Sequence, residues 1–289
     1  MKNVSFIKTP EEIAFFQDGG GEKGFDLLDI DALFMVWETN PEVVKKLVPA
    51  PLEPLAPIAF SYIANMGGCS HWKNYNEGAL YIPVKHDGGV SFYCLAMAIG
   101  GKNDTAIALG REVFGYPKKN ASELAVVRTG NHVHAWIERH GIRYIDVEAE
   151  IGEYNTPEAA NILGAFKTGA EVPGNVANFH YGIESIGDKA SFTNVKLVDS
   201  LCKFKFSSVE NAKINNITLK PSADDPWAEV EVVRPLGAAY VRCDISMFDT
   251  KLIAEVDPQE AAPYLFSRWD ASTLGHTYRS FVNNGKADL

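Results

Sequence analysis

Residues 110–119 read GREVFGYPKK, and they join the end of a short helix to the start of an extended segment. The helix before this stretch can be capped by Asp104 or Thr105, and Gly115 stands where helices commonly end. Pro117 prevents the helix from continuing and biases the residue before it toward extended geometry. The stretch therefore predicts a change from helix to strand immediately before its two lysines.

The two lysines, Lys118 and Lys119, are neighbours in this predicted strand. Because successive side chains of a strand point to opposite faces, one lysine should face inward and the other outward. An inward lysine beside Phe114 and Tyr116 would be partly desolvated, which disfavours its charged form. A neutral lysine amine is a nucleophile toward carbonyl groups. The ordinary alternative is a solvated surface pair, and the flanking residues favour the reactive lysine over it.

The stretch resembles the signature of the acetoacetate decarboxylase family, in which Gly-Arg-Glu is followed by Tyr-Pro-Lys-Lys. In that family the first lysine forms a Schiff base, and it is a standard example of a lysine activated by desolvation or a neighbouring cation. Residues 38–53, which begin ETNP and end VPAPLE, are similar to an early helix of the family. Residues 75–84, YNEGALYIPV, are similar to the segment that carries its catalytic glutamate. The resemblance fades in the C-terminal half and runs to about residue 248.

The resemblance implies roles for individual residues. Lys118 matches the Schiff-base lysine, and Glu77 matches the glutamate near its nitrogen, where a carboxyl group could transfer protons. A loop glutamate in water is the alternative for Glu77. Tyr116 and Met97 are similar to the hydrophobic lining near the lysine, a role that overlaps with plain core packing.

Arg111 and Glu112 lie inside the motif, and adjacent residues on a helix face different ways. We expect one of them to form a structural ion pair and the other to orient the site.

Two polar groups of the family's decarboxylase site are replaced in this chain. Ile30 stands where the family has an arginine that helps to bind the substrate carboxylate. The family's second site glutamate is replaced by Ser61 or by Tyr62, depending on where one alignment gap is placed. A charge-assisted hydrogen bond contributes roughly 1.5–3 kcal/mol, so the missing arginine could weaken acetoacetate binding by about one or two decades. The lysine chemistry survives these replacements, but the choice of substrate does not follow from the family.

These residues predict a cofactor-independent lyase in which Lys118 attacks the ketone of a β-keto acid, carbon dioxide leaves, and the enamine is protonated. An aldolase-dehydratase, with the same imine but a new bond to an aldehyde, is the alternative that Ile30 suggests. A non-catalytic small-molecule-binding barrel is the alternative from another class. It predicts that no imine can be trapped on Lys118.

The expected secondary structure consists of many closely spaced strands and few helices. Helices are expected at 10–17, from 41 to before 49, at 157–167 and at 258–269, with a break in the chain at 67–68. Strands are expected at 27–37, 56–66, 79–86, 90–99, 120–128, 132–139, 142–150, 192–208, 216–220, 229–233 and 238–245. The pattern indicates an α+β protein, mostly antiparallel β, with peripheral helices. We expect an N-terminal arm at 1–25 and a single domain at 26–289, and the resemblance implies a closed, cone-like β-barrel with the lysine inside.

The 289-residue chain carries 37 acidic and 27 basic residues, and its net charge of −10 argues against nucleic acid or an anionic membrane as a partner. No apolar run approaches the roughly 18 residues needed to span a membrane, and the N-terminus lacks a secretory pattern. We therefore expect a cytoplasmic protein whose partner is a small-molecule keto acid or another carbonyl compound. The family resemblance also implies a homo-oligomer.

No metal site is predicted. The four cysteines are scattered without a Cys-x-x-Cys pair. His132 and His134 share one face of a strand and could be metal ligands, but no third ligand is evident nearby. We expect neither a metal nor a cofactor.

Overall fold

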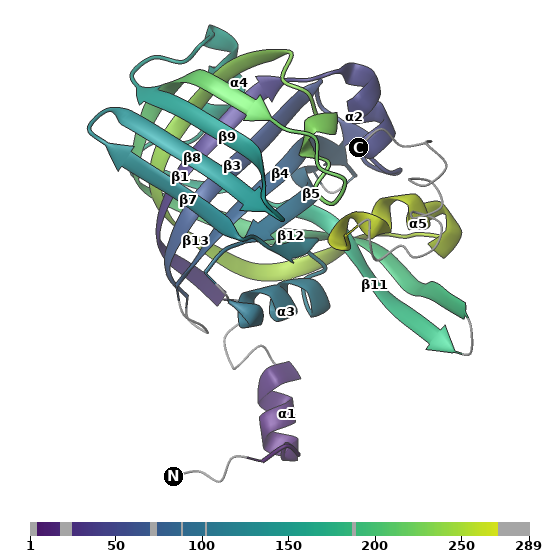
Figure 1. The fold of residues 1–289 in the computed structure, drawn as a ribbon. Coiled ribbons are helices and arrows are strands. Elements are labelled where there is room, and N and C mark those ends of the chain that lie inside the picture. Colours follow the sequence, from purple (N-terminus) through teal and green to yellow (C-terminus); the bar gives the residue numbers. More distant parts are fainter. Residues whose placement is uncertain are drawn as a thin grey trace.

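The computed structural model describes residues 5–17, 25–69, 74–87, 89–101, 103–186 and 189–270. One sheet of thirteen strands dominates these residues, with the order β11-β5-β4-β3-β1-β13-β12-β9-β8-β7 and three short strands at its side (Figure 1). The strands are β1 (Phe25–Glu38), β2 (Glu53–Pro54), β3 (Ile58–Cys69), β4 (Tyr75–His86), β5 (Gly89–Ile99), β6 (Lys118–Asn120), β7 (Glu123–Thr129), β8 (His132–Arg139), β9 (Ile142–Ile151), β10 (Glu171–Pro173), β11 (Val176–Ile186), β12 (Lys189–Leu219) and β13 (Arg234–Glu255). The helices are α1 (Pro10–Gln17), α2 (Pro41–Leu47), α3 (Asp104–Glu112), α4 (Ala160–Leu163) and α5 (Pro258–Leu265), with 3-10 helices η2 (Pro157–Ala159), η3 (Trp227–Glu229) and η4 (Phe266–Arg268).

The sheet curves into a near-closed ring. β11 pairs with β12 along most of its length and in parallel with β5 at two positions, Val176 opposite Phe92 and Ala177 opposite Tyr93. This pairing joins the two edges of the path β5-β4-β3-β1-β13-β12. The mostly antiparallel β ring expected from the sequence is thus confirmed.

The long strand β12 belongs to two parts of the molecule. Its first part pairs with β11 and β13 in the ring, and its last residues pair with β9. The hairpins β7–β8–β9 then lie against the outside of β1, β3 and β4. The sequence predicts separate strands at 192–208 and 216–220, whereas the structure has one strand, which changes its partner from β13 to β9 at Ala212 instead of ending.

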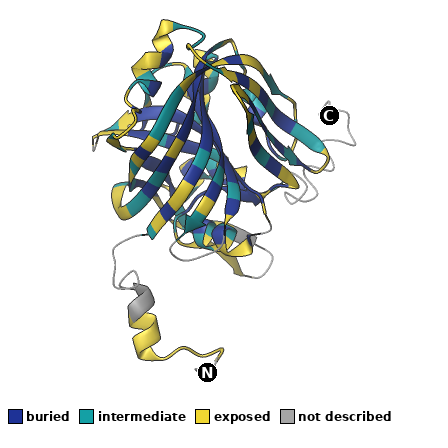
Figure 2. Ribbon diagram, turned by 90° about the vertical axis from the view of Figure 1, so that its left-hand side faces the viewer, coloured by how far each residue is buried: buried dark blue, intermediate teal, exposed yellow. Residues whose placement is uncertain are grey.

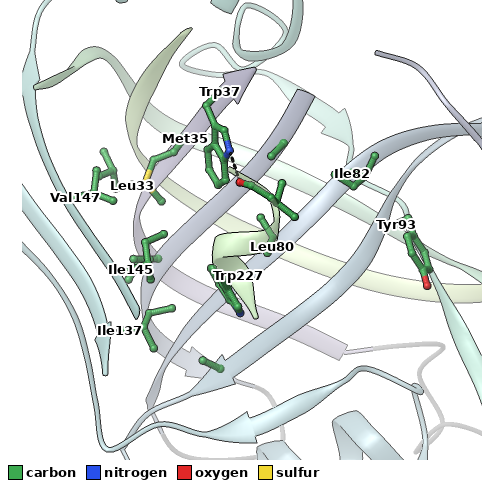
Figure 3. Close-up of a cluster of buried hydrophobic side chains, with 14 of the residues drawn as sticks. Leu33, Met35, Trp37, Leu80, Ile82, Tyr93, Ile137, Ile145, Val147 and Trp227 are labelled. Atoms are coloured by element: carbon green, nitrogen blue, oxygen red, sulfur yellow. Dashed lines mark hydrogen bonds between the residues drawn. The ribbon is translucent and has the colours of Figure 1, made fainter. Parts of the chain in front are cut away.

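A hydrophobic core fills the space between the ring and β7–β9. In Figure 3, Ile137 and Ile145 of β8 and β9 face Leu33 of β1, and Trp37 lies at the end of the same cluster. The indole Nε1 of Trp37 donates to the carbonyl of Val230 at 3.1 Å, which satisfies its polar atom in the core. This packing holds the outer face of β1, β3 and β4, so that their inner face is free to form the ring interior.

A second hydrophobic cluster fills the ring itself. Its aromatic centre is Phe34, whose ring contacts Phe60, Tyr62, Phe166 and others within ring-centroid distances of 5.4–6.3 Å. Along the strands, buried residues alternate with more exposed ones, and Figure 2 shows the buried residues in dark blue and the exposed residues in yellow. Successive side chains of β1 point to opposite faces, and both faces are buried. One face therefore contributes to the ring interior and the other to the core between the ring and β7–β9.

Helix ends follow local sequence signals. Asn40 caps α2 by accepting from the Glu42 amide at 3.0 Å, and Pro41 occupies the first helical position. The cap of α3 was expected at Asp104 or Thr105 but is Asn103, whose Oδ1 accepts from the Ala106 amide at 3.0 Å. The helix begins one residue earlier than the expected caps allow, because Asn is an equally strong N-cap.

Three other expectations are wrong. Residues 67–68 do not break the chain but continue β3, since Gly67 lies against the bulge of β1 at Asp29, where a side chain would collide with the Asp29 carbonyl. Residues 229–233 form no strand; η3 and an irregular segment bury Trp227 instead. The helix expected at 157–167 ends at Leu163.

The C-terminal helix expected at 258–269 is α5 followed by η4. Strands β10 and β11 were not expected at all. None of the helices described is long and apolar enough to cross a membrane.

Candidate active site

Lys118 begins β6, a three-residue strand that runs parallel to the end of β5, with Lys118 opposite Met97. Its side chain enters the ring interior and is only 6% exposed. Helix α3 covers it from the other side, and Gly110 of this helix lies directly over the lysine. A Cβ at that glycine would sit 2.6 Å from the lysine Cε, so only glycine leaves room for the extended side chain.

The lysine ammonium meets a buried carboxylate. Lys118 Nζ donates to Glu77 Oε2 at 2.9 Å, and Glu77, on β4, is 3% exposed. A proton can move across this hydrogen bond from the ammonium to the carboxylate, which leaves a neutral amine and a carboxylic acid in contact. This is the arrangement that a Schiff-base nucleophile and its general acid–base partner require.

Two tyrosines complete the surroundings of the carboxylate. Tyr62 Oη donates to Glu77 Oε1, and Tyr75 Oη donates to Glu77 Oε2 at 3.2 Å. Burial raises the pKa of Tyr62 and of Tyr75 well above the usual value of a phenol, and the negative charge of Glu77 raises both further. Both phenols therefore stay protonated and act as donors, which orient the carboxylate toward Lys118.

A cavity of about 60 Å³ lies in front of the pair. Among the lining residues described, Lys118 is the only cation and Glu77 the only anion. Apolar and aromatic side chains provide the rest of the surface, together with Cys202; burial raises the pKa of its thiol to about 12. The cavity is lined by Phe25, Leu27, Tyr62, Tyr75, Glu77, Tyr81, Met97, Ala106, Gly110, Phe114, Tyr116, Lys118, Gly174, Val176, Cys202, Phe204, Ile245 and Met247.

The structure brings five of the sequence-predicted residues together at this cavity. Lys118, Glu77, Tyr116, Met97 and Tyr62 all line it. The neighbouring Ser61 points to the opposite face of β3 and donates to the Ala79 carbonyl at 2.8 Å, so of the two residues Tyr62 is the one that lines the cavity.

The other three predicted residues lie outside the cavity lining. Ile30 is buried in the ring interior but does not line the cavity described here. Arg111 donates to the carbonyls of Lys118 at 3.5 Å and Arg268 at 3.2 Å, so it anchors the backbone of β6. Glu112 is exposed at the end of α3. The expected ion pair of one residue and the expected orienting role of the other stay predictions.

Lys119 lies on the opposite face of β6, as strand alternation predicts, but it does not reach solvent. Its Nζ donates to the Asp224 carbonyl and lies 3.5 Å from an Asp225 carboxylate oxygen and 3.7 Å from one of Asp270. Burial lowers the pKa of Lys119, and the two carboxylates act in the opposite direction. The expectation of an outward lysine is wrong because the C-terminal segment after η4 and the loop before η3 cover this face.

Three residues that could hold a metal ion lie together in the part of the chain that the structure describes. The ligand atoms of His140, Asp224 and Asp270 lie within 4.8 Å of one another. Arg139 Nη2 already binds Asp270 at 2.7 Å, so a cation occupies part of this cluster. His132 and His134 both lie on β8; His134 binds Asp146 at 2.8 Å, and His132 is exposed.

Sequence reasoning missed several residues of the site. Tyr75 could have been found, because it stands two positions before Glu77 on the same strand face. Gly110 opens the quoted stretch, but the need for a glycine there arises only when α3 folds over Lys118. Phe204 and Met247 come from β12 and β13, and no motif marks them.

The comparisons with known proteins agree with this geometry. A sequence model described as acetoacetate decarboxylase (ADC) matches residues 14–256, so the chain belongs to the acetoacetate decarboxylase family. It is 32% identical over 285 residues to a CLA biosynthesis isomerase of Lactiplantibacillus plantarum, a match that covers 96% of this chain and 99% of that protein. An acetoacetate decarboxylase of Burkholderia cenocepacia is 29% identical over 119 residues, which cover 41% of this chain and 47% of that protein.

Solved structures of acetoacetate decarboxylases share the fold of this chain. The crystal structure of acetoacetate decarboxylase from Legionella pneumophila superposes with a TM-score of 0.68 at 15% identity, over 88% of this chain and 93% of that one. The resemblance of the sequence to the acetoacetate decarboxylase family is thereby confirmed. The similar proteins include both a decarboxylase and an isomerase, so family membership defines an enzyme family and leaves the reaction open.

Proposed function

We propose that this chain forms a Schiff base between Lys118 and a ketone, and that it uses Glu77 to move a proton along the substrate, so that a carbon–carbon double bond of an unsaturated ketone changes place. The hydrogen bond of 2.9 Å between Lys118 Nζ and Glu77 Oε2 inside a mostly apolar cavity carries this proposal. The isomerase of Lactiplantibacillus plantarum, similar over its whole length, supports the reaction class.

The steps balance without a cofactor. The neutral amine of Lys118 adds to the carbonyl carbon, the carbinolamine loses water, and a protonated imine results. This cation acidifies the neighbouring carbon–hydrogen bonds, and Glu77 accepts one proton to give a dienamine. Glu77 then returns the proton at a different carbon, and water hydrolyses the new imine to release the isomerised ketone and the free amine.

The surroundings of the lysine suit a neutral substrate. The described lining offers no cation other than Lys118. The resemblance to the family implies that Ile30, which is buried outside this lining, replaces an arginine of the decarboxylases. A carboxylate placed in this cavity would lose its water without gaining a charged partner except the imine itself. A ketone with apolar substituents meets no such cost.

Decarboxylation of a β-keto acid, the reaction predicted from the sequence, is the second candidate. It uses the same lysine, and the imine cation would accept the electron pair that carbon dioxide leaves behind. The matching family and the retained Lys118–Glu77 pair favour it.

Proton exchange in deuterium oxide distinguishes the candidates. The protein is incubated with an unsaturated ketone, and NMR follows deuterium at the positions on both sides of the double bond; acetoacetate in a parallel sample reports carbon dioxide release. We expect exchange and double-bond migration with wild type and neither with Lys118→Ala. Carbon dioxide release without migration supports the decarboxylase, and a condensation product with an added aldehyde supports the aldolase-dehydratase.

Borohydride trapping tests the Schiff base itself. An adduct on Lys118, located by peptide mass spectrometry and absent from Lys118→Ala, is expected with any ketone that enters the cavity. A folded protein that gives no adduct with any carbonyl compound would instead be a non-catalytic binding barrel. Size-exclusion chromatography of the same samples tests the proposed homo-oligomer.

A further inference from the structure

The cavity at Lys118 is small for a substrate. Its volume is about 60 Å³, whereas pockets that enclose a whole organic ligand measure roughly 300–1,000 Å³. A ketone larger than a few carbons cannot lie entirely inside. Its carbonyl can reach Lys118 only if the rest of the molecule passes out through the rim of the cavity, so the rim contributes to substrate choice.

The burial of the lining residues locates this rim. Most of them are buried, and the ones that are partly exposed are Phe25, Phe114, Phe204 and Met247. These side chains come from the first residue of β1, the turn after α3, the middle of β12 and β13. In the register, Phe25 lies directly opposite Met247. The cavity therefore meets solvent between the end of α3 and the start of β1.

Two rings of this rim are in contact with each other. The centroids of Phe25 and Phe114 lie 5.2 Å apart with their planes inclined by 55°. The position of Phe114 is anchored on both sides: its amide donates to the Leu109 carbonyl at 3.2 Å, and its carbonyl accepts from Asn178 Nδ2. Gly115 follows with φ of 75°, where any side chain would collide with the Phe179 carbonyl. The Phe114 ring is thus held over the opening by its backbone.

The chemistry of the rim is uniform. Three phenylalanines and a methionine surround the opening, and none of the four carries a charge. A charged group passing between them would lose its hydration without a partner, whereas a hydrocarbon chain would exchange water for apolar contact. Methionine adapts its shape to neighbours of varied form, which suits a chain that must slide past it.

We propose that Phe25, Phe114, Phe204 and Met247 form the entrance of the site and select ketones that carry an unbranched hydrocarbon chain, with the chain lying against these four side chains when the carbonyl is at Lys118. This inference rests on the proposed function, because it assumes that Lys118 forms an imine. It adds the substrate class: a ketone within or at the end of a long apolar chain, whose polar groups remain beyond the rim.

The test compares two saturated methyl ketones in cyanoborohydride trapping, followed by intact-mass spectrometry. Acetone fits inside the cavity after it has entered, whereas the chain of methyl nonyl ketone must lie across the rim while its carbonyl is at Lys118. Wild type should be half-modified at a lower concentration of methyl nonyl ketone than of acetone. Phe25→Trp narrows the opening and should slow trapping of methyl nonyl ketone about tenfold, with acetone changed less than about twofold. Phe114→Trp should act in the same direction.

Phe248→Trp is the matched control, because Phe248 follows Met247 on β13 but is exposed and lines a different groove. It should trap both ketones as wild type does, and thermal melting confirms that each variant is folded. Equal trapping of both ketones by wild type, or equal effects of Phe25→Trp on both, overturns the entrance. Absence of any Lys118 adduct with acetone in wild type overturns the Schiff base itself, so the two failures are distinguishable.

Discussion

Replacing Gly110 by alanine is the sharpest perturbation that this site allows. The new Cβ would lie 2.6 Å from Cε and 3.1 Å from Nζ of Lys118, whereas an ordinary contact begins at 3.4 Å. Because the clash involves the end of a flexible side chain, the lysine can give way, by about 1 Å at Cε. Displacement of this size in a reacting group can slow a reaction by about 10²-fold.

A similar slowing of the reaction is expected from the loss of the hydrogen bond between Lys118 and Glu77. Lys118 Nζ and Glu77 Oε2 are 2.9 Å apart, and a shift of about 1 Å away from Glu77 exceeds the range of a charge-assisted hydrogen bond, which contributes roughly 1.5–3 kcal/mol. That loss corresponds to about one to two decades in the rate of imine formation. Global stability should change little, since alanine is preferred to glycine in a helix interior by about 0.5–1 kcal/mol and offsets part of the strain.

The assay measures imine formation and stability on the same samples. Trapping with acetone and cyanoborohydride gives the rate of Lys118 modification, and circular dichroism gives the melting temperature. Gly152→Ala is the matched control, because a Cβ at Gly152 meets nothing within 4 Å. A Gly110→Ala protein that melts like wild type and still traps acetone at the wild-type rate would refute the argument that α3 positions the lysine.

Three further outcomes follow from the contacts of other residues. Tyr62→Phe removes a donor to Glu77 and should slow proton exchange in the substrate about tenfold, while leaving the melting temperature within a few degrees; an unchanged exchange rate measured by NMR would contradict the role of the phenol. Asp225→Asn leaves the buried cations Lys119 and Arg139 without their full counter-charge and should lower the free energy of unfolding, measured by urea titration, by about 3–5 kcal/mol. Glu53→Gln, which removes a charge from an exposed pair with Lys85, is the control and should change this free energy by less than about 0.5 kcal/mol. Similar values for both variants would contradict the buried network. Burial lowers the pKa of His180, so in mild acid the folded state binds fewer protons at this residue than the unfolded state does, and stability is lost as the pH falls. The melting temperature of His180→Asn should therefore fall less than that of wild type between about pH 7.5 and about pH 5. An equal fall would exclude His180 as a source of the acid sensitivity.

Much of the site could be read from the order of residues because its chemistry is local. The stretch at 110–119 places a helix end, a proline and two lysines within ten positions, and strand alternation alone sends Lys118 and Lys119 to opposite faces. The same rule, applied to β4, places Tyr75 beside Glu77. These predictions depend on bond geometry within one segment, which the sequence carries directly.

Other features depend on segments that are far apart in the chain. Lys119 is covered because Asp225 and Asp270, more than a hundred residues later, fold over it. The single strand β12 continues where two strands were expected, because its partner changes from β13 to β9 and supplies new hydrogen bonds. Neither outcome can be read from the local pattern, since a strand ends only when no partner remains to pair with its backbone.

The sequence by itself identified Lys118 and Glu77 as the candidate pair and predicted the class of fold. Lys118, Glu77 and the alternating pattern of the strands are properties of short segments, and they predict a mostly antiparallel β protein with imine chemistry. Only the tertiary structure decided how much space lies in front of the lysine and what surrounds it. The size of the cavity, the two phenols on Glu77, the glycine over Lys118 and the apolar rim at Phe25 all arise where β1, β3, β4, α3, β12 and β13 meet, because closing a sheet into a ring brings together side chains that no periodicity along the chain connects.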